Sequence, residues 1–138
     1  MWKIIQTLMV VILLSSCMAG DFRKYVVHYV PLDVDYYAPP SREDIIKWGV
    51  RFEIYSPVLD EMYEVVNAQN GEILSSDDRA LIRILIINND NREIFITQDK
   101  TIISFQNNKK YTLNSRQIND ILTVITEIGD DLLRKISN

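Results

Sequence analysis

Cysteine, histidine and glycine are scarce in this chain, and their scarcity excludes several common chemistries. The 138 residues include one cysteine, one histidine and four glycines. One cysteine cannot form an internal disulfide, and one cysteine with one histidine cannot complete a zinc site. No glycine-rich phosphate loop is present, and no serine has the sequence context of a nucleophile elbow with His28 as its base. We therefore expect no enzymatic activity, no metal and no cofactor.

Positive charge is also in deficit. The chain has 15 Lys and Arg residues against 19 Asp and Glu residues, and its net charge is −4. A nucleic-acid-binding domain needs a basic surface that neutralises phosphates, so we expect no nucleic-acid partner. An acidic domain attracts basic proteins instead, and a basic protein is the partner that the charge favours.

The N-terminal segment has the three-part layout of an export signal. Lys3 supplies positive charge, residues 4–14 are apolar apart from Gln6 and Thr7, and two serines follow. The apolar run is too short to span a bilayer, which requires about 20 apolar residues. The pattern therefore indicates a cleaved leader rather than a membrane-spanning helix.

The end of this segment, Leu14-Ser15-Ser16-Cys17, resembles the lipobox of bacterial lipoproteins. In that class a diacylglycerol is attached to the cysteine thiol, and a peptidase then cuts before the cysteine. The resemblance implies a signal peptide over 1–16, a lipidated tether over 17–24 and a single domain over 25–138. Two alternatives remain at this point: an ordinary signal peptide cleaved near residues 18–20, and an apolar N-terminal helix of a cytosolic protein.

The lipobox implies a location as well as a modification. Lipid on Cys17 would hold the protein at a membrane of the cell envelope, because each buried methylene contributes about 0.8 kcal/mol and two or more acyl chains make the anchor stable. Met18 follows the cysteine where an Asp would direct inner-membrane retention in enterobacteria. This is similar to the outer-membrane default, which in a Gram-negative host places the domain in the periplasm.

The hydrophobic pattern predicts an α+β fold, with an antiparallel sheet and helices packed on one face. Short helices are expected after Ser41 and from Ser56-Pro57, where capping residues stand, and a longer C-terminal helix follows Asn114. The connections between the last four strands are too short for crossovers and predict a meander. We expect a loop over 72–78. The expected strands are residues 25–30, 50–55, 79–88 at the centre of the sheet, 93–97, 101–105 and 111–113.

One loop carries the best candidate contact residues. Asp33, Asp35, Tyr36 and Tyr37 lie in a proline-rich segment, where tyrosines suit binding hot spots and acids steer basic partners. The alternative is that the tyrosines fold back on the domain. A second candidate is the acidic face of the helix after Ser56, formed by Asp60, Glu61 and Glu64.

These observations favour a membrane-anchored, protein-binding lipoprotein of the cell envelope, in the class of inhibitors and toxin-immunity proteins. The hairpins, the short Tyr-Thr-Leu strand and the closing helix are similar in pattern to small bacterial immunity proteins, without a diagnostic motif. The alternative function is that of a structural or assembly lipoprotein in an envelope machine.

Lipid attachment can be tested directly. A palmitate analogue fed to cells should label the wild-type protein and leave Cys17→Ser unlabelled, because Cys17 is the one thiol in the chain. Equal labelling of both proteins would contradict the lipobox, and an exported but unlabelled wild type would indicate an ordinary signal peptide.

Overall fold

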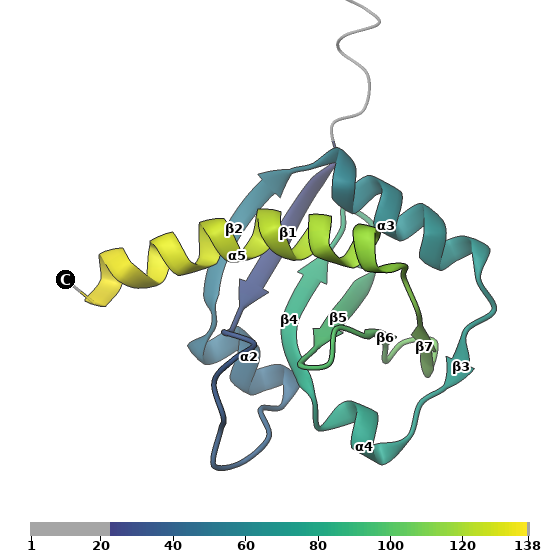
Figure 1. The fold of residues 1–138 in the computed structure, drawn as a ribbon, viewed down its shortest axis with the longest axis horizontal. Helices are drawn as coiled ribbons and strands as arrows, with labels where there is room; N and C mark the ends of the chain where they lie inside the picture. The colour runs from purple at the N-terminus through teal and green to yellow at the C-terminus, as the bar shows by residue number, and fades with distance from the viewer. Residues whose placement is uncertain (1–22, 138) are drawn as a thin grey trace, which may run out of the picture.

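The computed structural model describes residues 23–137, so Cys17 and the expected leader lie outside the described residues. Within that range, one antiparallel sheet of seven strands packs with four helices (Figure 1). No helix of residues 23–137 is both long and apolar enough to cross a membrane. In chain order the elements are β1 (Lys24–Tyr29), α2 (Arg42–Trp48), β2 (Val50–Tyr55), α3 (Pro57–Ala68), β3 (Glu72–Ile73), α4 (Ser76–Arg79), β4 (Ile82–Ile87), β5 (Glu93–Thr97), β6 (Ile102–Ser104), β7 (Lys109–Tyr111) and α5 (Ser115–Ser137).

The strand order is β2-β1-β4-β5-β6-β7-β3. Strands β4 to β7 form the predicted meander, and each of its three turns contains one residue with positive φ: Asn91, Lys100 and Asn108. Strand β1 lies between β2 and β4, with Val27 paired to Phe52 on one side and to Ile86 on the other. The predicted α+β class is confirmed.

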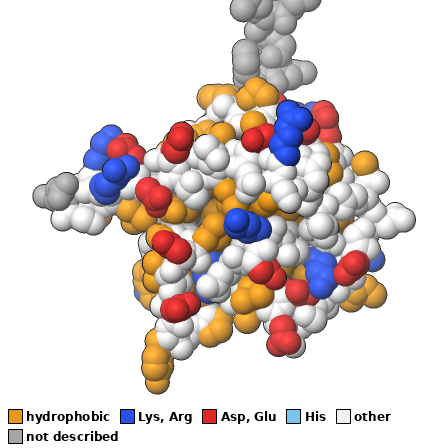
Figure 2. Space-filling view, viewed as in Figure 1, with side chains coloured by type: hydrophobic (Ala, Val, Ile, Leu, Met, Phe, Trp, Pro, Cys, Tyr) orange, Lys and Arg blue, Asp and Glu red, His pale blue; other side chains and the backbone are white. Residues whose placement is uncertain are grey.

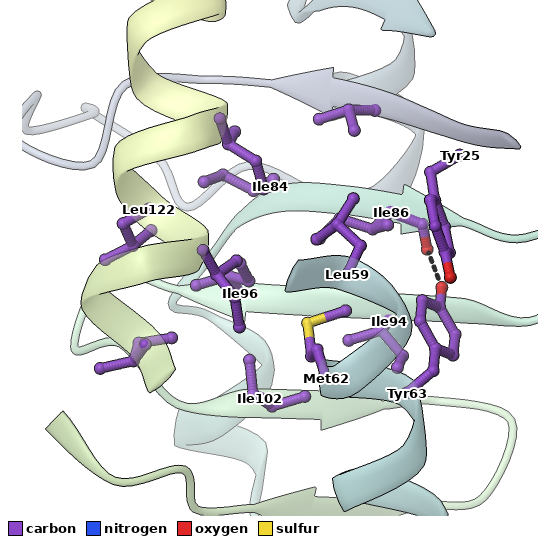
Figure 3. Packing of buried hydrophobic residues seen from close by; sticks show 14 of the residues in the cluster. Tyr25, Leu59, Met62, Tyr63, Ile84, Ile86, Ile94, Ile96, Ile102 and Leu122 are labelled. Carbon is purple, nitrogen blue, oxygen red and sulfur yellow. Dashed lines mark hydrogen bonds between the residues drawn. The ribbon is translucent and has the colours of Figure 1, made fainter. Parts of the chain in front are cut away.

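The larger core lies between one face of the sheet and the two longer helices. Alternate residues of β4 and β5, including Ile84, Ile86 and Ile96, are fully buried against α3 and α5. Figure 3 shows these isoleucines beside Leu59 and Leu122, which come from the two helices. The positions in between, such as Leu85 and Phe95, belong to a second cluster on the opposite face. The sheet centre is therefore apolar on both faces, as a central strand over 79–88 required.

The short helix α2 covers part of that second face. Its one buried residue, Ile45, joins the cluster of Leu85 and Phe95. The predicted arrangement, with helices on one face, holds for α3 and α5, and α2 is an addition on the other side.

Two tyrosines close the end of the larger core near α3. The rings of Tyr25 and Tyr63 stack with centroids 5.4 Å apart. The Tyr63 hydroxyl donates to the Ile86 carbonyl oxygen at 3.0 Å, a hydrogen bond drawn as a dashed line in Figure 3. The Tyr25 hydroxyl donates to Asp60. Each buried phenol therefore has an acceptor, so its burial leaves no polar group unpaired.

Three stretches differ from the sequence expectation. The strand expected over 79–88 begins at Ile82, because Arg79 is the last residue of α4. Residues 72–78 include the two-residue strand β3 and the start of α4, because Ser75 and Asp78 form a capping box there. The last strand begins at Lys109 rather than at Tyr111, because the turn before it closes at Asn108. Strand β7 contains two lysines. Its outer neighbour, β3, is only two residues long, so β7 lies close to the edge of the sheet, where lysine side chains can reach solvent.

The C-terminal helix is continuous through Gly129, and a contact explains why glycine stands there. A Cβ at this position would come within 2.2 Å of the Tyr29 ring. The next residue, Asp130, accepts a hydrogen bond of 2.7 Å from the Tyr29 hydroxyl. Helix α5 therefore rests on the end of β1 at a point where only hydrogen fits.

Replacing Gly129 by Ala should destabilise the protein although alanine favours helix. The added methyl overpacks against Tyr29, at a cost of roughly 1–3 kcal/mol, while the gain in helix propensity is about 1 kcal/mol. Urea unfolding measures the difference. In a double-mutant cycle with Tyr29→Leu, the cost of the alanine should shrink; an undiminished cost would contradict the contact.

Candidate partner-binding site

The candidate site lies where the end of β1, the 31–40 loop, α2 and the end of α5 meet. Helix α2 is fixed first: Ser41 and Asp44 form a capping box, and Arg42 makes a bidentate ion pair with Glu93 of β5, at 2.5 and 2.9 Å. This hydrogen bonding raises the pKa of Arg42. The pairing holds α2 on the sheet and directs Trp48, which is 69% exposed, to the rim of the site.

A cavity of about 250 Å³ opens at this junction. Three aromatic residues from three elements line it: Tyr29 at the end of β1, Tyr36 in the loop and Trp48 at the end of α2. Asp44 is the acidic residue of the lining, and Leu133 of α5 closes one side. Such a hollow, mostly apolar and with a carboxylate in its wall, is typical of a binding site for an apolar group that carries positive charge nearby.

The two loop tyrosines behave differently. Tyr37 is fully exposed, at 109% of the reference value for an extended residue. The Tyr36 ring lies over the Arg83 guanidinium, with 5.0 Å between the guanidinium carbon and the ring centroid. Burial raises the pKa of the Tyr36 phenol. Of the two interpretations of this loop, folding back therefore describes Tyr36, whereas Tyr37 projects into solvent.

Arg83 holds the 31–40 loop in place. It is only 4% exposed, and its guanidinium donates to the Ile82 carbonyl oxygen at 2.8 Å and to Gln98 at 3.0 Å. Among residues 23–137 no carboxylate pairs with it, and its Nε has no hydrogen-bond partner there. Burying a guanidinium without a carboxylate costs desolvation free energy, and the cation–π contact with the Tyr36 ring offsets part of that cost. The same contact anchors the loop on the sheet.

Four carboxylates lie in or beside the cavity wall, together with two cations: Arg83 beneath the Tyr36 ring, and Lys47, whose Nζ lies 5.8 Å from the centroid of the Trp48 ring. Asp33 and Asp35 are exposed in the loop, Asp44 lies in the wall, and Asp130 is held near the opening by its bond from Tyr29. Burial and this bond raise the pKa of Tyr29. Figure 2 shows acidic side chains between α5 and the lower left of the molecule, where the hydrophobic side chains of the loop project.

The second predicted contact surface lies elsewhere. Asp60, Glu61 and Glu64 are on α3, and Asp60 accepts the hydrogen bond from Tyr25, near the start of β1. The loop follows the other end of that strand. The structure therefore keeps the two acidic groups apart, with Asp60 in a structural contact and Glu61 and Glu64 exposed on the helix.

Sequence reasoning did not identify Tyr29, Asp44, Trp48 or Leu133 as site residues. Trp48 had a recognisable signal, since a large aromatic residue ends a short helix just before Gly49. Leu133 and Tyr29 had none, because they belong to core patterns and meet only through the tertiary contact at Gly129.

The single histidine lies buried on the sheet. His28 is 7% exposed, stands opposite Arg51 of β2, and its Nδ1 has no hydrogen-bond partner within residues 23–137. Within the same range, no three His, Cys, Asp or Glu side chains come close enough to hold a metal ion.

Comparisons with protein-family models, curated proteins and solved structures found no match.

Stability should depend on pH through His28. Burial, and then the charges of Arg51 and Arg42, lower the pKa of His28 below its ordinary value of 6.5. The unfolded chain therefore takes up a proton before the native state does, and stability falls as the pH drops below 6.5. Urea midpoints measured from about pH 7.5 to about pH 5 should show this decline.

The matched control is His28→Gln, which removes the titration and should flatten the profile over that window. The pKa values of Glu53 and Asp78 are lowered from ordinary values of 4.5 and 3.8. The stability that these two carboxylates contribute is therefore lost only at lower pH than the His28 effect. An unchanged slope in His28→Gln would contradict this assignment.

Proposed function

We propose that the protein is a lipid-anchored, protein-binding lipoprotein of the cell envelope that recognises a basic partner through the 31–40 loop and the adjoining cavity. The observation that carries the proposal is the arrangement at this junction. A fully exposed tyrosine, Tyr37, and a largely exposed tryptophan, Trp48, flank a cavity of about 250 Å³ with an acidic wall. Large exposed aromatics beside a pocket are typical of binding hot spots.

The contacts that hold the loop and α2 in place support binding with little rearrangement. Tyr36 is held on Arg83, and α2 is held on the sheet by Arg42 and Glu93. A preformed site avoids the entropic cost of ordering a loop upon association. The exposed acids Asp33 and Asp35 then act at longer range, by raising the rate at which a basic partner arrives.

The order of the chain supports an anchor that is remote from this site. The tether leads into the start of β1 at Lys24, and the loop begins after the other end of that strand. A strand of six residues spans about 20 Å, which separates Lys24 from the start of the loop.

We favour an inhibitor or immunity function over an assembly function, because the site is one compact, preformed pocket. A single secreted toxin or hydrolase would fit it. The alternative is an assembly lipoprotein, and it is distinguished by what binds: a set of envelope components rather than one protein.

The decisive experiment captures the partner in the cell. A photo-crosslinking amino acid at Tyr37 should give one discrete adduct, identified by mass spectrometry, that disappears when Trp48→Ala is added. The matched control places the same amino acid at Asn119, which is exposed on α5 near its start. No adduct from Tyr37, or an adduct equally strong from Asn119, would contradict the site; a series of adducts would favour the assembly function.

Two sets of substitutions separate the contacts once the partner is known. Tyr37→Ala with Trp48→Ala should weaken binding by at least about 2 kcal/mol, because both side chains are exposed aromatics with area to bury. Asp33→Lys with Asp35→Lys should instead slow association and weaken its dependence on salt. Surface plasmon resonance at several salt concentrations measures both effects. Unchanged binding in both pairs would exclude the loop.

A further inference from the structure

Strand β2 is a long, regular edge of the sheet. It is six residues long and pairs only with β1 among the described strands, without a proline or a bulge. The opposite edge, β3, has two residues. An edge strand presents the N–H and C=O groups of alternate residues to a neighbour, and long regular edges pair readily with another strand.

The side chains of β2 are complementary to a second copy in one antiparallel register. If Phe52 pairs with Phe52 of the other copy, Arg51 stands opposite Glu53 twice, and Val50 stands opposite Ile54 twice. Within one chain Arg51 lies 2.9 Å from Glu53, and Lys24 lies 3.0 Å from the same carboxylate. The dimer would add two cross-strand ion pairs to these contacts, one on each side of the axis. The apolar residues Val50, Phe52 and Ile54 all stay on the face that α5 covers.

The end of α5 supplies an independent observation. Figure 1 shows its last turns projecting past β2, beyond the edge of the sheet. The apolar stripe of the helix continues there: Leu132 is half-buried and Ile136 is 73% exposed. These residues follow Gly129, which packs on Tyr29, the residue paired with Val50.

The same register places a surface beneath the overhang. Because Val50 of one copy would lie opposite Ile54 of the other, helix α5, which packs on Tyr29 beside Val50 and contacts β2, would continue over the second copy's Ile54. Ile54 faces the core side yet is only half-buried in a single chain. The two overhanging helix ends would lie on either side of the symmetry axis, one over each copy's Ile54.

We propose that this protein forms a symmetric dimer by antiparallel pairing of β2 with β2 of a second copy, in the register that joins Arg51 to Glu53. The dimer has one continuous sheet across both chains. The two β1 strands then begin at opposite ends of the dimer, so both tethers reach one membrane when the strands lie along its plane. The dimer goes beyond the proposed partner site and does not depend on it.

Cysteine crosslinking of the full-length protein in cells tests the register. Two differently tagged copies, one with Arg51→Cys and one with Glu53→Cys, should form a disulfide-linked pair under a mild oxidant. Opposite residues in adjacent strands lie about 4.5–5.5 Å apart, whereas diagonal ones lie about 7–8 Å apart. The matched controls, in which both tagged copies carry Arg51→Cys or both carry Glu53→Cys, should therefore link much less, and wild type gives the background from Cys17.

Charge exchange tests the same contact without cysteine. Differently tagged wild-type copies should co-purify in detergent, and Arg51→Glu should co-purify with itself about tenfold less, because like charges then face each other. Glu53→Arg should show the same loss. Mixing the two variants should restore co-purification, which also shows that both are folded.

Three results would overturn the dimer: wild-type copies that do not co-purify, single variants that associate as strongly as wild type, or a mixture that fails to recover. The register would be overturned if two copies that both carry Arg51→Cys formed a disulfide more readily than the mixed pair.

Discussion

The sheet centre is apolar on both of its faces, and the rest of the structure follows from the need to cover both. Ile84 and Ile86 of β4 point to one side and Leu85 to the other, and all are fully buried. The two long helices α3 and α5 cover the first side. Within residues 23–137 the second side is covered by α2 and neighbouring loops, so the chain returns across it between β1 and β2. That return brings the 31–40 loop, Arg83 and Trp48 to one end of the molecule.

Much of the fold could be predicted from the sequence, because the longer strands and helices have clear hydrophobic periods. The alternation in 50–55, the almost continuous apolar run in 79–88 and the stripe after Asn114 each correspond to an observed element. Asn114 and Gln117 form the reciprocal cap that starts α5. Strand β3 and helix α4, with two and four residues, are too short to show a hydrophobic period. The pair Ser75 and Asp78 nevertheless has the spacing of a capping box, which indicates a helix start.

The candidate site was predictable only in part, because its residues come from one continuous loop and from three other elements. Asp33, Asp35, Tyr36 and Tyr37 could be identified from tyrosines and acids within a proline-rich stretch. The cavity also needs Trp48 and Leu133, which pairing and helix packing bring to the loop from elsewhere in the chain. The separation of Asp60 from the loop is likewise a property of the topology, because β1 places them at opposite ends.

The position of β1 has a consequence for the order of folding. This strand precedes the other described elements in the chain, yet its two neighbours are β2 and β4, and β4 comes after β2, α3, β3 and α4. The meander from β4 to β7 consists of local pairings that close quickly, whereas the pairing of β1 with β4 must close a long loop. The first strand therefore remains without its second neighbour until more than half of the chain is available, and the two aromatic ends of β1, Tyr25 and Tyr29, stay exposed until then. Until β4 is available, the free edge of β1 is therefore a place where the incompletely folded domain can pair with another chain.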